Sequence, residues 1–239
     1  MNALTQDDFE HRLAALRQQC DARGATLLAV TKGASLAQIR RAWALGVRDV
    51  GENRVQDALA KMEALNGETA QSVGSGAPGS LRWHLIGHLQ GNKVAKTVGR
   101  FHLIHSIDTT DLAQRLSDAN ASRNCVQAIL LQINVAQEPQ KYGFAPEALP
   151  EALSLIRRLP GVRVEGLMAM TPLRAEAEES IKIFTKLYDL RMALSDAFAR
   201  TPARLSMGMS QDYIHALACG ATIVRVGSFL FGEERVRAL

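Results

Sequence analysis

The sequence lacks most of the features that mark specialised protein classes. Its 239 residues include three cysteines, Cys20, Cys125 and Cys219, which are too few and too far apart for a disulfide framework or a metal site. Aromatic residues make up only 5% of the chain, and no run of basic residues accompanies them, which disfavours nucleic-acid binding. No apolar run approaches the ~20 residues of a membrane helix, and the N-terminus has no apolar signal-peptide core. We therefore expect a cytoplasmic protein that binds neither nucleic acid nor a membrane.

What remains is an ordinary globular composition, with 47% hydrophobic and 22% charged residues. The formal net charge of +4 suits small anionic ligands such as phosphates. We predict one domain over residues 1–239, present as a monomer or weak dimer. The stretch 66–80, NGETAQSVGSGAPGS, is rich in glycine and serine and is interpreted as a mobile surface loop.

Eight short apolar runs alternate with helical patterns along the chain. An amphipathic helix over 5–23, capped by Thr5, precedes them. This order is typical of an α/β fold, specifically a (β/α)8 TIM barrel with an extra N-terminal helix. An open doubly wound sheet is the alternative, but no GxGxxG motif follows the first strand. The predicted strands cover residues 25–31, 47–53, 81–87, 101–107, 125–135, 162–170, 203–208 and 222–227.

Polar residues gather at the predicted strand ends, while the strand bodies look apolar. In a TIM barrel the chemistry lies at the C-terminal ends of the strands. The strand-end residues include Lys32, Glu52, Asn53, His88, His105, Asp108, Asn134, Thr171, Ser206, Ser210, Asp212, Arg225, Gly227 and Ser228.

Lys32 ends the apolar stretch ATLLAVT and is the sharpest single signal. An amine desolvated at the rim of a barrel has a lowered pKa and can attack a carbonyl to form a Schiff base. The alternative is a lysine that reaches out into solvent.

Strands seven and eight end in a pattern that suits a phosphate group. Ser210 offers a hydroxyl, and Gly227 and Ser228 open a short helix whose N–H groups can bind an anion. The alternative is that Ser210 merely caps a helix and Gly227 merely makes a turn.

Other strand-end residues favour structural roles. His84 and His88 in WHLIGH lie on a predicted strand and loop and not on a helix, and no nearby Glu completes an HExxH motif, so we expect hydrogen bonding and no metal site. Glu52 and Asp212 are acid–base candidates, although helix capping or a surface ion pair is the preferred interpretation for each.

Taken together, these motifs resemble the pyridoxal phosphate homeostasis protein family, the YggS/PROSC group. The resemblance covers about residues 27–232. Its fold is similar to the barrel domain of alanine racemase. The motifs that carry it are AVTK, VGENRVQ, WHLIGHLQGNK, SID, NVAQEPQKYG, GLMAM, LSMGMSQDYIHAL and VRVGSFLFG.

The resemblance implies a role for each matching residue. Lys32 corresponds to the lysine that holds pyridoxal 5'-phosphate as an internal aldimine. Arg225 corresponds to the arginine facing the pyridine nitrogen, and Asn53 to an asparagine beside the ring. The resemblance implies a phosphate site made by Ser210, Gly227 and Ser228, with assistance from Ser206. The segment KGASL departs from the family, because Gly33 follows the lysine and no proline is nearby.

The family function implied is intracellular vitamin B6 homeostasis without robust catalysis. Arg225 can only donate a hydrogen bond, so it would leave the pyridine nitrogen unprotonated and the electron sink weak. The chain ends at Leu239, soon after the last strand, so we expect no second domain to contribute a second base. Of the three tyrosines, only Tyr142 lies in a rim loop.

Two alternatives stay open at this point. One is a pyridoxal-phosphate-dependent amino-acid racemase of weak or broad activity, and the other is a Schiff-base aldolase acting on a phosphorylated substrate. In the carrier hypothesis the partners are pyridoxal 5'-phosphate and apoenzymes that accept it, with Lys141 as a candidate second acceptor of the aldehyde.

Overall fold

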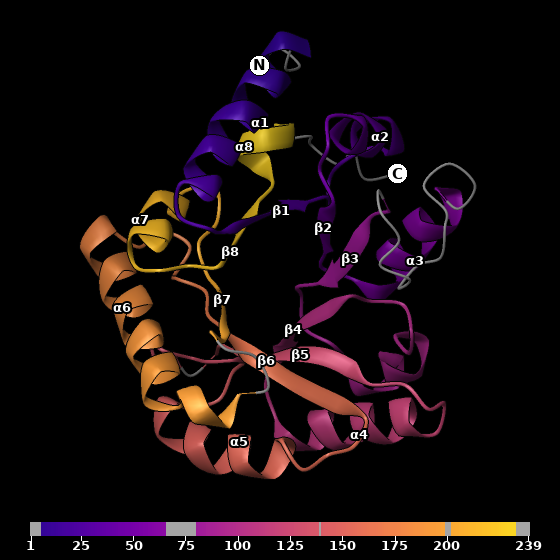
Figure 1. Ribbon diagram of the computed structural model, residues 1–239, viewed down its shortest axis with the longest axis vertical. Coiled ribbons are helices and arrows are strands. Elements are labelled where there is room, and N and C mark those ends of the chain that lie inside the picture. The colour runs from indigo at the N-terminus through magenta and orange to yellow at the C-terminus, as the bar shows by residue number, and fades with distance from the viewer. Residues whose placement is uncertain (1–5, 66–79, 139, 199–201, 233–239) are drawn as a thin grey trace.

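Eight parallel strands close into a barrel in which each strand pairs with the next along the chain (Figure 1). The computed structural model describes residues 6–65, 80–138, 140–198 and 202–232. The first strand pairs with the last, with Leu28 opposite Arg225, so the sheet has no free edge. The TIM-barrel prediction is therefore confirmed. The strands are β1 (Thr26–Val30), β2 (Asp49–Glu52), β3 (Arg82–Leu85), β4 (Leu103–Ile107), β5 (Gln127–Gln132), β6 (Val162–Met168), β7 (Arg204–Ser206) and β8 (Ile223–Val226).

The helices lie around the outside of this barrel, as Figure 1 shows. The expected cap Thr5 lies outside the described residues, as does nearly all of the predicted loop 66–80. The α-helices are α1 (Gln6–Asp21), α2 (Leu36–Ala44), α3 (Val55–Ala64), α4 (Thr110–Ala121), α5 (Leu149–Ile156), α6 (Ala177–Ala193), α7 (Tyr213–Ala218) and α8 (Ser228–Phe231). Short 3-10 helices are η1 (Gly91–Lys96), η2 (Pro146–Ala148) and η3 (Ser195–Ala197).

The helix after β3 is not an α-helix: η1 is a six-residue 3-10 helix. Gly91 and Asn92 open it, and both residue types have low helix propensity. Thr97 closes it by donating its N–H and its hydroxyl to the carbonyl of Val94, at 2.9 and 2.7 Å. These i→i+3 contacts end the helix before an α-helical turn can continue.

Two apolar layers build the core, since successive side chains of a strand point to opposite faces. The larger layer lies between the strands and the helices, where Ile104, Ile129 and Phe184 are fully buried. A small second cluster lies on the opposite face of the strands, inside the barrel, and we call it the inner cluster: Leu28, Leu103, Ala128, Leu130, Met168 and Ile223, with Ile86 packed against it. The strand bodies are not purely apolar, however, because His84 and Ser206 are also fully buried in them.

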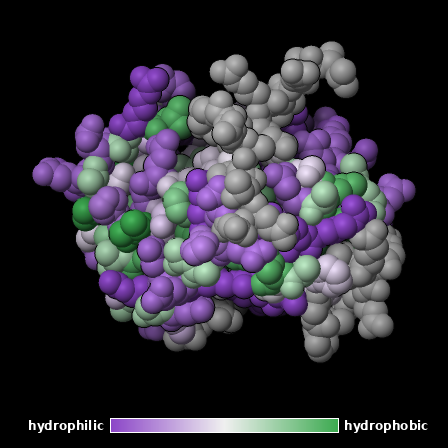
Figure 2. Space-filling view, turned by 90° about the horizontal axis from the view of Figure 1, so that it is seen from above, coloured by the Kyte–Doolittle hydropathy of each residue, from purple (hydrophilic) through white to green (hydrophobic). Residues whose placement is uncertain are grey.

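The N-terminal helix α1 packs against α8, and both lie beside β1 (Figure 1). The Arg12 guanidinium donates to the carbonyl of Phe229 at 2.9 Å, and the rings of Phe9 and Phe231 lie 5.7 Å apart. The face seen in Figure 2 is largely hydrophilic, with hydrophobic residues scattered across it. Within the described ranges, no helix is both long and apolar enough to cross a bilayer.

Gly166 in β6 provides a test of barrel packing. Its φ is +155°, and a Cβ at this position would lie 2.0 Å from the carbonyl oxygen of Arg204 on β7. We expect Gly166→Ala to lower the free energy of unfolding by about 1–3 kcal/mol or more, because the two strands must separate. Urea denaturation measures this change. Gly33→Ala is the control, since a Cβ there meets nothing within 4 Å; equal midpoints for the two variants would contradict the prediction.

Candidate functional site

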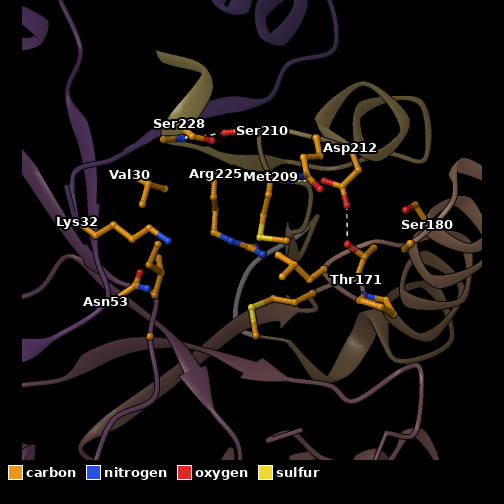
Figure 3. A pocket seen from close by; sticks show the side chains of 18 of the residues that line it. Val30, Lys32, Asn53, Thr171, Ser180, Met209, Ser210, Asp212, Arg225 and Ser228 are labelled. Carbon is orange, nitrogen blue, oxygen red and sulfur yellow. Dashed lines mark hydrogen bonds between the residues drawn. The ribbon is translucent and has the colours of Figure 1, made fainter. Parts of the chain in front are cut away.

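A cavity of about 610 Å³ opens at the C-terminal ends of the strands (Figure 3). The barrel topology places it there, because each strand turns outward into its loop at this end. Six of the seven predicted site residues line it: Lys32, Asn53, Ser210, Arg225, Gly227 and Ser228. The cavity also extends among the loop after β6, helix α6 and the start of α7, where Thr171, Ser180 and Asp212 line it.

Lys32 follows β1 and extends its amine toward the middle of the cavity, where the Arg225 guanidinium lies (Figure 3). The preceding residue, Thr31, is fully buried and donates its hydroxyl to Glu52 Oε1 at 2.6 Å. Lys61 Nζ donates to the same carboxylate oxygen at 2.7 Å. The backbone that carries Lys32 is therefore anchored to β2 and α3.

Lys32 itself is exposed, so the expectation of a desolvated amine is wrong. The apolar stretch before it suggested burial, but the strand ends at Val30 and the chain has left the barrel two residues later. Glu52 forms the expected ion pair with Lys61, although the pair is not on the surface: the Glu52 side chain is 0% exposed.

Ser210 collects two backbone donors from the start of α8. The N–H groups of Gly227 and Phe229 both lie 3.3 Å from Ser210 Oγ. Gly227 sits against β1, since a Cβ there would lie 3.1 Å from the carbonyl oxygen of Val30. A hydroxyl and two N–H groups therefore converge at one end of the cavity, beside Ser228 (Figure 3).

Arg225 on β8 is only 4% exposed, yet it lines the same cavity. Its guanidinium donates to Ser206 Oγ at 2.7 Å and to the carbonyl of Ala169 at 3.1 Å. Burial lowers the pKa of Arg225 to about 10, while the carboxylate of Asp212 opposes this shift. The group is therefore a fixed cation with its donors held in defined directions.

Ser206 is the one predicted site residue that does not line the cavity. Its hydroxyl lies between Arg225 and His105 Nδ1, at 2.7 and 2.8 Å, in the barrel interior. Because β4 and β7 are not neighbours in the barrel, this contact crosses the interior. The hydroxyl that the resemblance assigns to the phosphate site is thus already used in holding Arg225.

His105 continues into a polar network that crosses the interior beside the apolar side chains. His105 Nε2 lies 2.9 Å from His84 Nδ1, and His84 Nε2 lies 3.0 Å from Asp49 Oδ1. Arg82 also pairs with Asp49. Among the described residues no group of three His, Cys, Asp or Glu side chains could hold a metal, and His84 is engaged in hydrogen bonds.

The network fixes the charges of its members. Burial lowers the pKa of His84 and, more strongly, that of His105, so both rings are neutral near pH 7. Burial opposes the charge on Asp49, but hydrogen bonds from His84 and Arg82 outweigh it and hold the pKa of Asp49 well below its usual range. The ionised Asp49 carboxylate therefore accepts from both His84 and Arg82, at the end of the barrel opposite the cavity.

The rim carries a second group, built from the strand-end residues His88 and Asp108 and from Tyr142 in a rim loop. His88 Nδ1 lies 2.9 Å from Asp108, and its ring stacks on Tyr142 with centroids 3.9 Å apart. His88 and Tyr142 both line the cavity. Lys141 does not line it; its amine pairs with Glu138 at 2.6 Å instead.

Asp212 has neither of the structural roles expected for it. It accepts the Met209 N–H at 2.6 Å and the Thr171 hydroxyl at 2.6 Å, so it joins two loops of the cavity (Figure 3). It makes no side-chain hydrogen bond to the start of α7.

The hydrogen bonding expected of His84 is confirmed, but the place of His84 and His105 inside the barrel was not predicted, although a signal for it exists. The spacing of two between Leu103 and His105, and between His84 and Ile86, places each histidine on the same face of its strand as an apolar residue of the inner cluster. Reading each strand with a period of two would have placed both rings inside the barrel.

Comparison with known proteins is consistent with this geometry. The family model for "Alanine racemase, N-terminal domain" matches residues 4–235. The pyridoxal phosphate homeostasis protein of Aquifex aeolicus is 38% identical over 228 residues, covering 93% of this chain and 95% of that protein. The protein of the same name from Escherichia coli (strain K12) is 33% identical, covering 95% and 97%. The chain belongs to the pyridoxal phosphate homeostasis protein family.

The solved structures that resemble this family member include close and distant neighbours. PipY of Synechococcus elongatus, solved "with PLP bound", superposes with a TM-score of 0.82 and 37% identity over 94% of this chain and 100% of its own. Alanine racemase of Clostridium difficile superposes with a TM-score of 0.74 but 13% identity, covering 97% of this chain and 58% of its own. The latter likeness shows the shared fold only.

The buried histidines predict how the stability of this homeostasis-family chain depends on pH. Burial lowers the pKa of His84 and His105 from an unfolded value of about 6.5. Partial desolvation lowers the pKa of the more exposed His102 to about 4. The unfolded chain therefore binds more protons below pH 6.5, and we expect the free energy of unfolding to fall as the pH decreases from 6.5 toward 4. The Asp49 contribution is lost only below about pH 4, since the pKa of Asp49 is lowered.

Urea denaturation at constant ionic strength, at intervals from pH 7.5 to 4.5, measures this dependence. A free energy of unfolding that stays constant over that range would contradict it.

Proposed function

We propose that the protein binds pyridoxal 5'-phosphate covalently through Lys32 and takes part in intracellular vitamin B6 homeostasis. The observation that carries the proposal is the single cavity in which the Lys32 amine, the Arg225 guanidinium and the donors around Ser210 meet. The names of the relatives and the pyridoxal-phosphate complex of PipY support it.

The donors around Ser210 fit a phosphate group. Two N–H groups share one hydroxyl at 3.3 Å, which is long for a hydrogen bond to oxygen. A phosphate offers several charged acceptor oxygens, and hydrogen bonds to such oxygens are shorter and stronger. Ser210, Gly227 and Ser228 would hold it at the start of α8.

Arg225 fits the ring nitrogen of the same cofactor. A guanidinium has donors and no acceptor, so its partner must be an unprotonated nitrogen or an oxygen. An unprotonated pyridine nitrogen withdraws electrons weakly, which disfavours carbanion chemistry. Asn53 lines the cavity beside Lys32 and would contact the ring from that side.

The chemistry that the cofactor supplies is that of its aldehyde, which condenses with a primary amine and releases water. Lys32 is exposed, so water and other amines have access to the linkage. An enzyme of this chemistry would exclude water from the linkage. We therefore assign the chain to storage and transfer of the cofactor to apoenzymes, without robust catalysis of its own, in the cytoplasm.

The two alternatives fit the cavity less well. A racemase needs a second base opposite the lysine, and Tyr142 is the one tyrosine of the described residues that lines the cavity. That side chain is 59% exposed and its ring is stacked on His88. An aldolase without a cofactor leaves the buried Arg225 with no ligand to recognise.

The proposal is tested by mapping the covalent linkage. We expect the purified protein mixed with pyridoxal 5'-phosphate to show the visible absorbance of a Schiff base. Borohydride reduction followed by peptide mapping should place the adduct on Lys32. Lys32→Ala should abolish both signals, whereas Lys141→Ala should retain them because Lys141 lies outside the cavity.

Three outcomes would contradict the proposal. The first is an adduct on a different lysine, and the second is a protein that binds no cofactor. The third is sustained racemisation of amino acids at ordinary enzyme rates, which would favour the racemase alternative.

Ser210→Ala tests the phosphate site separately. We expect it to weaken binding of pyridoxal 5'-phosphate about tenfold or more, because a hydrogen bond to a charged group is lost. Pyridoxal, which has no phosphate, is the matched control and should bind the parent and the variant equally. Titration followed by absorbance measures both ligands, and equal weakening of both would rule out a phosphate role for Ser210.

A further inference from the structure

A continuous chain of hydrogen bonds runs through the barrel interior, from the cavity to the opposite end. Arg225 donates to Ser206 at 2.7 Å, and Ser206 Oγ lies 2.8 Å from His105 Nδ1. The two histidines are joined at 2.9 Å, and His84 reaches Asp49 at 3.0 Å. We call these five residues the histidine relay.

The relay spans the length of the barrel. Arg225 lines the cavity at the C-terminal ends of the strands, whereas Asp49 is the first residue of β2. The three groups between them, Ser206, His105 and His84, are each 0% exposed. Water therefore has no access to the middle of the relay, and each group depends on its neighbours for hydrogen bonds.

The two ends of the relay determine the direction of every bond in it. A guanidinium can only donate, and an ionised carboxylate can only accept. His84 must therefore carry its proton on Nε2, facing Asp49. As a neutral ring it then accepts at Nδ1, so His105 must also carry its proton on Nε2. His105 then accepts at Nδ1, and the Ser206 hydroxyl donates to it.

The charges around the histidines keep the rings neutral. Burial is the largest cause of the lowered pKa of both His84 and His105, and nearby cations lower each pKa further. Only Asp49 acts in the opposite direction on His84. The charged and titratable groups that face the pair are Asp49, Arg82, His102, Arg204 and Arg225.

We propose that the histidine relay positions Arg225 and fixes it as a hydrogen-bond donor to the ring nitrogen of the bound cofactor. Because the Ser206 hydroxyl donates its hydrogen bond to His105 Nδ1, its oxygen stays available to accept a hydrogen bond from Arg225. The second guanidinium nitrogen is fixed by the carbonyl of Ala169. Ser206, His105, His84 and Asp49 are thus positioning residues, and the inference rests on the proposed function.

The direction of the relay can be measured in the ligand-free protein. Nitrogen-15 NMR of the histidine rings at pH 7.5 should show His84 and His105 as neutral rings protonated on Nε2. In Asp49→Asn we expect the two rings no longer to be protonated uniformly on Nε2, because the amide can donate to His84 as well as accept from it. His102→Gln is the control, because this exposed neighbour makes none of the relay's bonds.

An Nδ1-protonated or charged ring at either position in the parent would overturn the proposal. So would a His105 pattern that is unchanged in Asp49→Asn. If Asp49 and His84 only filled space, a substitution at Asp49 would not change the tautomer of His105, which lies two hydrogen bonds away.

The effect on the cofactor is measured with pyridoxal 5'-phosphate carrying nitrogen-15 in its ring. The ring nitrogen should report an unprotonated state in the parent and in His102→Gln. Ser206→Ala should weaken binding about tenfold or more and shift the ring-nitrogen resonance, because the hydrogen bond that orients Arg225 is lost. Ser206→Thr, which keeps the hydroxyl, should recover most of the affinity.

The outcomes separate this inference from the proposed function. A parent protein that binds no cofactor contradicts the proposed function, whatever the histidine tautomers are. A parent that binds normally, with unchanged affinity and ring-nitrogen resonance in Ser206→Ala, contradicts the relay.

Discussion

A guanidinium buried at the mouth of the barrel is the constraint from which the rest of the interior follows. Arg225 is 4% exposed, and a charge with so little access to water must be compensated by hydrogen bonds or by an opposite charge. Ser206 and the Ala169 carbonyl supply the hydrogen bonds, and Asp212 supplies the nearby negative charge. Once Ser206 accepts from Arg225, its own proton needs an acceptor inside the barrel, and His105 provides it.

The same logic explains why the polar interior ends in a carboxylate. Each neutral histidine accepts a hydrogen bond at Nδ1 and donates one from Nε2, so the last ring needs an acceptor, and the Asp49 carboxylate provides it. Asp49 is held in turn by Arg82, whose side chain is 43% exposed at the far end of the barrel. Two arginines at opposite ends thus enclose a network in which every histidine nitrogen and the Ser206 hydroxyl has a partner, and such networks stabilise a single arrangement of their side chains.

The proposed phosphate site depends on a separate support. Its donors begin α8, a helix of only four residues that could not hold its position alone. Helix α1 supplies the support, because Arg12 bonds the Phe229 carbonyl and Phe9 packs against Phe231. The extra N-terminal helix therefore contributes to the cavity without lining it.

The sequence predicted what depends on periodicity, and missed what depends on contacts across the barrel. Apolar runs gave all eight strands, and barrel topology then brought Lys32, Arg225 and Ser210 together from strands far apart in the chain. The role of Ser206 could not be predicted in this way, because its partners lie on β4 and β8. The exposure of Lys32 was missed for a similar reason, since the strand ends two residues before it.

The contrast between Lys32 and Arg225 is the strongest physical argument for a carrier. Arg225 is buried and held by two hydrogen bonds, which suits the proposed recognition of the cofactor ring. Lys32 is exposed, so a linkage formed there remains accessible to hydrolysis and to other amines. Catalysis on such a linkage requires water to be excluded, whereas transfer requires access. Firm recognition of the ring beside an accessible covalent linkage therefore favours holding and releasing the cofactor over using it.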